Sequence, residues 1–213
     1  MSRPRTQAER LAVTRATLMH EARLIFAASG YDAAATEEIV QRAKVTRGAL
    51  YYHFKDKRAV FEAIVEEVAS EIAAAIDKRA EPAGDPLQAL IEGTRAFIDA
   101  CLDPAVRRIY LIDAPAVLGW HRWREIDAPH GLRSLREGVA AVLAARPDQT
   151  LSVEPITFLL SGAFNEAALW VAEAKDEKAA RREMDRTLVQ LMERLFGSPD
   201  EPARPPRARA RAS

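Results

Sequence analysis

The sequence predicts an all-α protein of about nine helices, without strands. Residues that favour helices, chiefly alanine, leucine, glutamate and arginine, dominate the 213-residue chain. Apolar residues recur at intervals of three and four, which is the spacing of one buried helix face, and the alternation typical of strands is hardly visible. Glycine and proline cluster so as to leave stretches of about 10–25 residues between them, each long enough for a helix.

The composition excludes several classes of protein. A hydrophobic fraction of 48% is too high for a disordered chain. The longest apolar runs, such as residues 156–160, are far shorter than the roughly 18–20 residues of a membrane span, and the N-terminus has no apolar signal segment. The single cysteine, Cys101, excludes an internal disulfide and a cysteine-based metal cluster. We therefore expect a cytoplasmic protein that needs no membrane and no cofactor.

The N-terminal part of the chain is expected to form four helices. In the first, apolar residues from Leu11 to Phe26 repeat on one face, and Gly30 follows as a stop signal. The expected ranges of the four helices are about 7–29, 36–43, 46–54 and 56–79.

The second and third of these helices are short and carry signals at their starts. Thr36 is the expected N-cap of the second helix, and Glu37 and Glu38 in its first turn favour the positive end of the helix dipole. Thr46 is the expected N-cap of the third helix. Two short helices joined by a tight turn have the geometry of a helix-turn-helix, whose second helix enters the major groove of DNA.

The residues of this segment divide into an inner and an outer set. The inner set is apolar and joins the two helices: Ile39, Val40, Ala43, Leu50 and Phe54. The outer set faces away: Arg47, Gly48, Tyr51, Tyr52 and His53. The small Gly48 lets a DNA backbone come close. Hydroxyl, imidazole and ammonium donors suited to phosphate oxygens stand at Thr36, Thr46, Tyr52, His53 and Lys57.

The rest of the sequence predicts a larger helical body that is followed by a tail. The expected helices cover about 86–101, 105–113, 117–126, 131–145, 151–174 and 176–196. The last two are long and joined by a short charged turn, which favours a helical hairpin. Residues 199–213 are rich in arginine and proline and lack large apolar residues, so we expect a disordered tail.

The formal net charge of zero is unevenly distributed. Residues 1–58 carry eleven Lys and Arg against six Asp and Glu, a net charge of +5. Residues 59–198 sum to −7 and residues 199–213 to +2. A basic head on an acidic body indicates that the head meets an anion and the body does not. Arg3, Arg5 and the arginines of the tail either add attraction to DNA or are simply solvated.

The N-terminal segment resembles the DNA-binding domain of TetR-family (tetracycline-repressor-like) transcriptional regulators over about residues 10–62. The matching residues are Gly30-Tyr31, Thr36-x-x-Ile39-Val40, Ala43, residues 45–54, Lys57 and Phe61. The resemblance implies a DNA-binding domain at residues 1–58 and a domain for ligand binding and dimerisation at residues 59–198. It also implies a homodimer formed through residues 151–196.

The same resemblance implies the partners and the DNA contacts. The partners would be double-stranded operator DNA and a small-molecule effector, which would act on the body and shift the helix that follows the head. The implied DNA contacts are Thr36, Thr46, Arg47, Gly48, Tyr51, Tyr52, His53 and Lys57. Among them, Arg47 is the candidate for a base contact, to guanine O6 and N7.

Aromatic residues of the body are candidates to line an apolar or aromatic effector's pocket. They are Phe97, Tyr110, Trp120, Trp123, Phe158, Phe164 and Trp170. Core packing is the alternative for each of them. His121 and Glu125 share a helix face and His130 follows, so a metal site is one reading of these residues. Polar residues at the surface are the more common reading. Cys101 is either a redox sensor or, more commonly for such a residue, a small buried hydrophobe.

These observations predict a ligand-responsive, sequence-specific transcriptional regulator without enzymatic activity. A repressor released from a near-palindromic operator by a small molecule is the expected form. The alternative is a helical small-molecule-binding or catalytic protein whose N-terminal motif is incidental.

Overall fold

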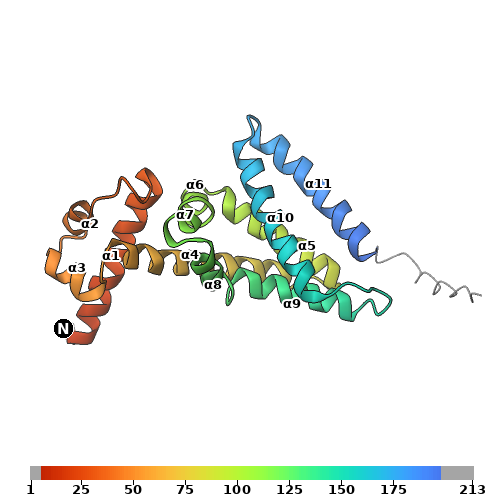
Figure 1. Cartoon of the computed structure of the whole chain (residues 1–213), viewed down its shortest axis with the longest axis horizontal. Coiled ribbons are helices and arrows are strands. Elements are labelled where there is room, and N and C mark those ends of the chain that lie inside the picture. The colour runs from red at the N-terminus through yellow and green to blue at the C-terminus, as the bar shows by residue number, and fades with distance from the viewer. Residues whose placement is uncertain (1–5, 198–213) are drawn as a thin grey trace, which may run out of the picture. The chain divides into compact units, whose positions relative to one another are not determined.

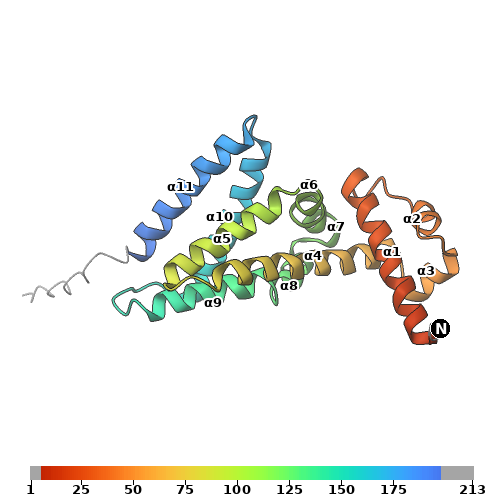
Figure 2. The same ribbon diagram turned by 180° about the vertical axis from the view of Figure 1, so that it is seen from behind.

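The computed structural model describes residues 6–197, and every regular element in that range is a helix (Figures 1 and 2). The expected all-α class is therefore confirmed. The tail at residues 199–213, together with Arg3 and Arg5, lies outside the described residues. Within residues 6–197, no helix combines the length and apolar character needed to cross a membrane.

The helices form two compact units. The first contains residues up to Ile72 together with Ala100–His130, and the second contains Ala73–Asp99 together with residues from Gly131 onward. Helices α4 (Lys57–Ala80) and α5 (Pro86–Leu102) contribute residues to both units. These units are defined by contacts between residues and not by function. The boundary at residue 58 between the DNA-binding and ligand-binding domains therefore stays a prediction.

The first unit begins with the three-helix head. Helix α1 (Gln7–Ser29) starts with a capping box, in which the Thr6 hydroxyl accepts the Glu9 N–H and the Glu9 carboxylate accepts the Thr6 N–H. Gly30, with φ 82°, ends the helix as expected. Helices α2 (Thr36–Arg42) and α3 (Arg47–His53) follow.

The two expected helix caps have different outcomes. Thr46 does cap α3, because its hydroxyl accepts the Ala49 N–H at 3.2 Å. The expectation that Thr36 caps α2 is wrong. The cap position belongs to Ala35, which offers no side-chain acceptor, and Thr36 is the first residue of the helix.

The segment after α5 departs most from the sequence expectation. Two plain helices were expected at residues 105–113 and 117–126. The structure instead has α6 (Pro104–Val106), the π-helix η1 (Arg107–Asp113), α7 (Ala114–Leu118) and α8 (Trp120–Asp127). Pro115 supplies the physical reason, because its ring would clash with the Leu111 carbonyl in α-helical geometry. A π-helical turn widens the backbone just before it, with the Ala114 N–H donating to Ile109 O.

Polar contacts tie this segment to the end of α1 and to α4. The Tyr31 N–H donates to Asp113 at 3.0 Å, and the Arg58 guanidinium donates to the Leu118 carbonyl at 3.1 Å. Arg122 pairs with Glu62 of α4 at 2.6 Å. These contacts explain why residues 100–130, far along the sequence from α1, belong to the same unit.

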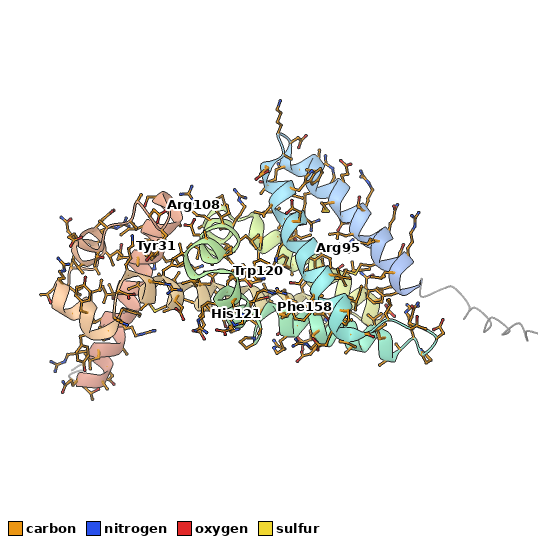
Figure 3. All side chains as sticks on the ribbon, in the orientation of Figure 1. Tyr31, Arg95, Arg108, Trp120, His121 and Phe158 are labelled. Atoms are coloured by element: carbon orange, nitrogen blue, oxygen red, sulfur yellow. The ribbon has the colours of Figure 1, made fainter. Side chains whose placement is uncertain are left out.

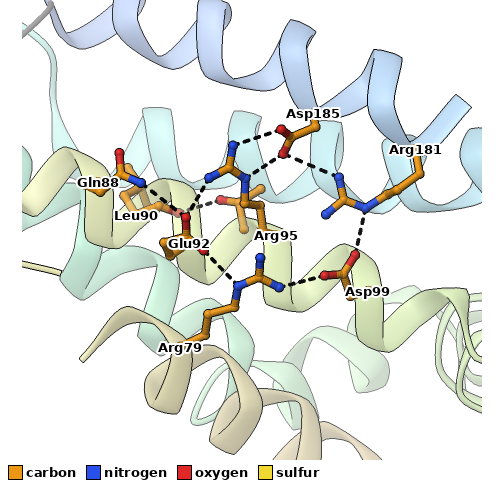
Figure 4. A network of polar contacts seen from close by, with 9 residues as sticks. Arg79, Gln88, Leu90, Glu92, Arg95, Asp99, Arg181 and Asp185 are labelled. Carbon is orange, nitrogen blue, oxygen red and sulfur yellow. Dashed lines mark hydrogen bonds and ion pairs between the residues drawn. The ribbon is translucent and has the colours of Figure 1, made fainter. Parts of the chain in front are cut away.

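The second unit contains α9 (Gly131–Ala144), α10 (Val153–Glu173) and α11 (Glu177–Phe196), and the last two form the expected hairpin (Figure 1). A network of ion pairs joins α11 to α5 and to the end of α4 (Figure 4). Arg95 pairs with Asp185 at 2.6 Å, and Asp99 pairs with both Arg79 and Arg181 at 2.7 Å. The hydrogen bonds from Arg95 lower the pKa of Asp185, which keeps this carboxylate charged.

Candidate nucleic-acid interface

The turn between α2 and α3 is closed by backbone hydrogen bonds. The Ala43 N–H donates to Ile39 O at 2.9 Å, and the Val45 N–H donates to Val40 O at 3.0 Å. Lys44 takes a positive φ of 55° between them, which reverses the chain within a few residues. The result is the tight connection that a helix-turn-helix requires.

The inner face of this segment is buried as the sequence predicts. Ile39, Ala43, Leu50 and Phe54 are all buried, and Val40 is half-buried. The Arg15 guanidinium of α1 lies 5.0 Å from the centre of the Phe54 ring. Because its inner side chains are fixed, α3 presents a defined set of residues on its outer face.

The outer face of α3 carries the predicted DNA-facing side chains. Arg47, Tyr51 and Tyr52 are exposed, Tyr52 to 69% of its surface. The hydroxyl of a tyrosine this exposed is accessible to a phosphate oxygen. His53 is half-buried, and its ring meets the Tyr52 ring edge-on at 5.2 Å.

Arg47 has two partners within the head. Its Nη1 lies 3.1 Å from Oε1 of Glu37 on α2, and its Nη2 donates to the Tyr51 hydroxyl at 3.4 Å. The Tyr51 hydrogen bond, and then the Glu37 charge, raise the pKa of Arg47. The sequence assigned Glu37 only to the first turn of α2. A pairing across the turn has no local sequence signal, so the structure was needed to find it.

Lys57, a predicted phosphate contact, also makes contacts within the protein. Its ammonium donates to the carbonyls of Tyr31 and Ala34, both at 2.9 Å, and lies 4.3 Å from the centre of the Tyr31 ring. It therefore fastens the start of α4 to the link between α1 and α2. Since an ammonium has three donors, one is left for a phosphate, and the predicted DNA contact stays a prediction.

Gly48 lies exposed in the first turn of α3. A Cβ atom built there would meet the Thr46 hydroxyl at 3.8 Å, an ordinary contact, so nothing in the described protein requires glycine. Close approach of the backbone to DNA stays the predicted reason for a glycine at this position.

Gly48→Ala should separate folding from DNA binding. We expect the free energy of unfolding to stay the same or rise by up to about 1 kcal/mol, because alanine favours helix over glycine. Operator binding should weaken, because the added methyl group stands on the DNA-facing surface. Denaturant titration and a gel shift measure the two effects. Gly84→Ala, at an open loop position of the second unit, is the control and should leave DNA binding unchanged.

Three of the predicted pocket aromatics come together in the first unit. The ring centres of Tyr110 and Trp123 are 5.7 Å apart, and those of Trp120 and Trp123 are 4.9 Å apart. Tyr110 and Trp123 are buried, whereas Trp120, which is labelled in Figure 3, is 62% exposed. The Arg124 guanidinium lies 5.6 and 5.7 Å from the centres of the two indole rings.

This aromatic cluster contains two notable polar groups. The Tyr110 hydroxyl donates to Asp127 at 2.6 Å, and burial raises the pKa of Tyr110 well above its ordinary value, so the donor proton is retained. Trp123 is 2% exposed, and its indole N–H has no hydrogen-bond partner among the described residues. A buried donor without an acceptor costs about 1–3 kcal/mol, which an acceptor would recover.

The other four predicted pocket residues lie in the second unit. Phe97 is half-buried on α5, Phe164 is buried on α10, and Phe158 and Trp170 are partly exposed on α10. The three α10 residues are six apart. Six residues make about one and two-thirds helical turns, so the three side chains do not share one face.

The metal and redox alternatives also have structural outcomes. His121 pairs with Glu125 at 3.1 Å, and among residues 6–197 no group of three or more His, Cys, Asp or Glu side chains is placed to hold a metal ion. Cys101 is fully buried, and burial raises the pKa of its thiol to about 12. A protonated, inaccessible thiol is a core residue and not a redox sensor.

Comparison with known families matches both parts of the chain. The family described as "Bacterial regulatory proteins, tetR family" matches residues 18–64. The family described as "Tetracyclin repressor-like, C-terminal domain" matches residues 87–195.

Comparison with individual proteins agrees with the family matches. A solved structure of a TetR-family transcriptional regulator from Pectobacterium atrosepticum is 30% identical, covers 90% of this chain and 98% of its own, and has a TM-score of 0.71. The A-factor receptor protein of Streptomyces griseus is 36% identical over 53% of this chain, which spans 40% of that relative. The Transposon Tn10 TetC protein of Escherichia coli is 24% identical over 80% of this chain and 86% of its own.

Proposed function

Because the chain belongs to the TetR family of DNA-binding transcriptional regulators, we propose that it is a repressor released from a near-palindromic operator by a small molecule. The single observation that carries the proposal is the outer face of α3. There Arg47, Tyr51 and Tyr52 stand exposed on a helix whose opposite face is buried. A recognition helix needs this combination of a fixed position and exposed donors.

The predicted DNA contacts divide into two roles. Arg47 reads a base, because a guanidinium donates to guanine O6 and N7 at once. Thr36, Thr46, Tyr51, Tyr52, His53 and Lys57 anchor phosphates, which fixes the register of α3 on the duplex without reading sequence. Gly48 lets the backbone approach.

A homodimer through residues 151–196 would place two such heads on one operator. The proposal is supported by an exposed face of α10 on which Leu159, Ala163 and Trp170 recur at helical spacing, with Leu159 69% exposed. An exposed apolar helix face in a regulator fits contact with a second copy. The two recognition helices would then lie one or two turns of DNA apart, at about 34–36 Å per turn.

The effector site is proposed at Tyr110, Trp120 and Trp123. The exposed Trp120 lies against Trp123, and the indole N–H of Trp123 lacks an acceptor among the described residues. An apolar or aromatic effector that carries a hydrogen-bond acceptor suits these two features.

Trp123→Phe tests this assignment of the effector site. Phenylalanine keeps an aromatic ring but removes the donor, so the dissociation constant of an acceptor-bearing effector should rise about tenfold. The effector would first be found by a thermal-shift screen of aromatic carbonyl compounds and then measured by calorimetry. Trp170→Phe, on the proposed dimer face of α10 and outside the proposed effector site, is the control for the loss of an indole N–H. Equal effector affinity in both variants would contradict the assignment.

The route from effector to head would run through η1. Tyr110 of η1 contacts Trp123. From the same helix, Arg108 donates to Ala28 O, and Asp113 accepts the Tyr31 N–H at the end of α1; Arg108 and Tyr31 are labelled in Figure 3. A change in η1 therefore reaches the head directly. Coupling between two such sites is typically about 1–3 kcal/mol and is reciprocal, so operator DNA should weaken effector binding by the same factor.

Selection of bound sequences from a random DNA library tests the function. A repressor of the proposed kind enriches a near-palindrome with two equal half-sites. The alternative, a small-molecule-binding or catalytic protein with an incidental motif, enriches no sequence, and that result would refute the proposal.

A further inference from the structure

Glu37 is an acidic residue at the edge of the predicted DNA-facing surface. It lies in the first turn of α2, and its Oε1 is 3.1 Å from Nη1 of Arg47, the first residue of α3. Both side chains are largely exposed, at 66% and 64%. The pair therefore stands exposed beside the predicted DNA-facing residues of α3.

A carboxylate in this place has few favourable partners on DNA. It repels phosphates, and it has no proton to donate to N7 or to O6 of guanine. The major-groove group suited to it is an exocyclic amino group, in particular N4 of cytosine. The charge of Glu37 is already neutralised by Arg47, so its approach to the groove costs less than that of an isolated carboxylate.

The geometry leaves both members of the pair able to bind bases. A carboxylate has about four acceptor positions and a guanidinium has five donors. Among the described contacts, Oε1 of Glu37 forms an ion pair with Nη1 of Arg47, and Nη2 of Arg47 donates to the Tyr51 hydroxyl. Acceptor positions on Glu37 and further N–H groups on Arg47 remain for DNA.

We propose that Glu37 is a specificity-determining residue, whose carboxylate accepts a hydrogen bond from N4 of a cytosine adjacent to the guanine that Arg47 reads. The proposal rests on the proposed DNA-binding function. Arg47 and Glu37 read two neighbouring bases as one unit, because each holds the other in place. The operator half-site accordingly contains a guanine next to a cytosine on one of its strands.

Selection from a random DNA library with the full-length protein tests this reading. The arms are the wild type, Glu37→Ala, Glu37→Gln and Glu38→Ala, each checked for an unchanged circular dichroism melting temperature. The wild type should prefer cytosine at the neighbouring position. Glu37→Ala should lose that preference, by roughly 5- to 150-fold in relative affinity. Glu37→Gln should shift it toward adenine, because an amide pairs with adenine N6 and N7.

Glu38→Ala is the matched control, since Glu38 is exposed one position later and is not the carboxylate that meets Arg47 among the described contacts. It removes the same charge and should change the affinity for all sequences alike. The proposal is overturned if the wild type prefers another base there. It is also overturned if Glu37→Ala keeps the cytosine preference or only strengthens binding to every sequence as Glu38→Ala does. A wild type that enriches no sequence refutes the DNA-binding function as well.

Discussion

Arg47→Ala should weaken operator binding by about 1–3 kcal/mol and relax the base preference at one position of each half-site. The reason is the proposed base contact, since a guanidinium can donate to O6 and N7 of guanine at once. In the described protein its guanidinium pairs with Glu37 at 3.1 Å and donates to the Tyr51 hydroxyl at 3.4 Å. Alanine removes the proposed base contact together with both of these contacts.

A comparison with Lys55→Ala distinguishes base reading from general attraction. Lys55 is exposed just after α3, so its loss removes one positive charge from the same head. Titration against the selected operator and against operators with single base changes measures both affinity and preference. We expect Lys55→Ala to weaken binding to all of these sequences alike. An unchanged base preference in Arg47→Ala would show that another residue reads the guanine.

Phe61→Ala should lower the free energy of unfolding of the first unit by about 3–5 kcal/mol. Phe61 is fully buried, and its ring lies 5.2 Å from that of Phe26 and 5.1 Å from that of Tyr31. These three rings join the end of α1, the following turn and the start of α4. Truncation leaves a cavity at the point where the head meets α4, so DNA binding should fail at temperatures well below the wild-type melting temperature.

Urea denaturation followed by circular dichroism measures this loss. Leu24→Ala is the control, because Leu24 lies on α1 and is largely exposed, so its change should stay within about 0.5 kcal/mol. Phe61→Leu should cost less than Phe61→Ala, since it retains most of the buried volume. If Phe61→Ala cost no more than Leu24→Ala, the packed rings of Phe26, Tyr31 and Phe61 would not be what joins α1 to α4.

Much of the head could be predicted because its signals are local. Thr46 caps α3 from three residues before Ala49, and Leu50 and Phe54 lie one helical turn apart, so adjacent sequence specifies both. The same reasoning predicts Thr36 as the N-cap of α2, whereas Thr36 is the first residue of the helix and Ala35 is the N-cap. In sequence, a threonine at the first helical position looks the same as a threonine at the cap.

Contacts between distant parts of the chain could not be predicted in this way. The pairing of Arg47 with Glu37 crosses a turn, and the use of Lys57 to hold Tyr31 O and Ala34 O depends on how α4 packs against the preceding link. Neither pairing follows from spacing, since helical periodicity says which residues share a face but not what that face meets.

The all-α class, the helix-turn-helix and its outward residues follow from the amino-acid sequence, because helix periodicity, caps and a tight turn are properties of neighbouring residues. The packing of residues 100–130 with the head, and the aromatics that gather around Trp123, were found in the folded protein. The π-helix that precedes Pro115 was found there as well. These outcomes depend on contacts between residues that are distant in sequence. One example is the buried Asp127, whose carboxylate accepts a hydrogen bond from the Tyr110 hydroxyl.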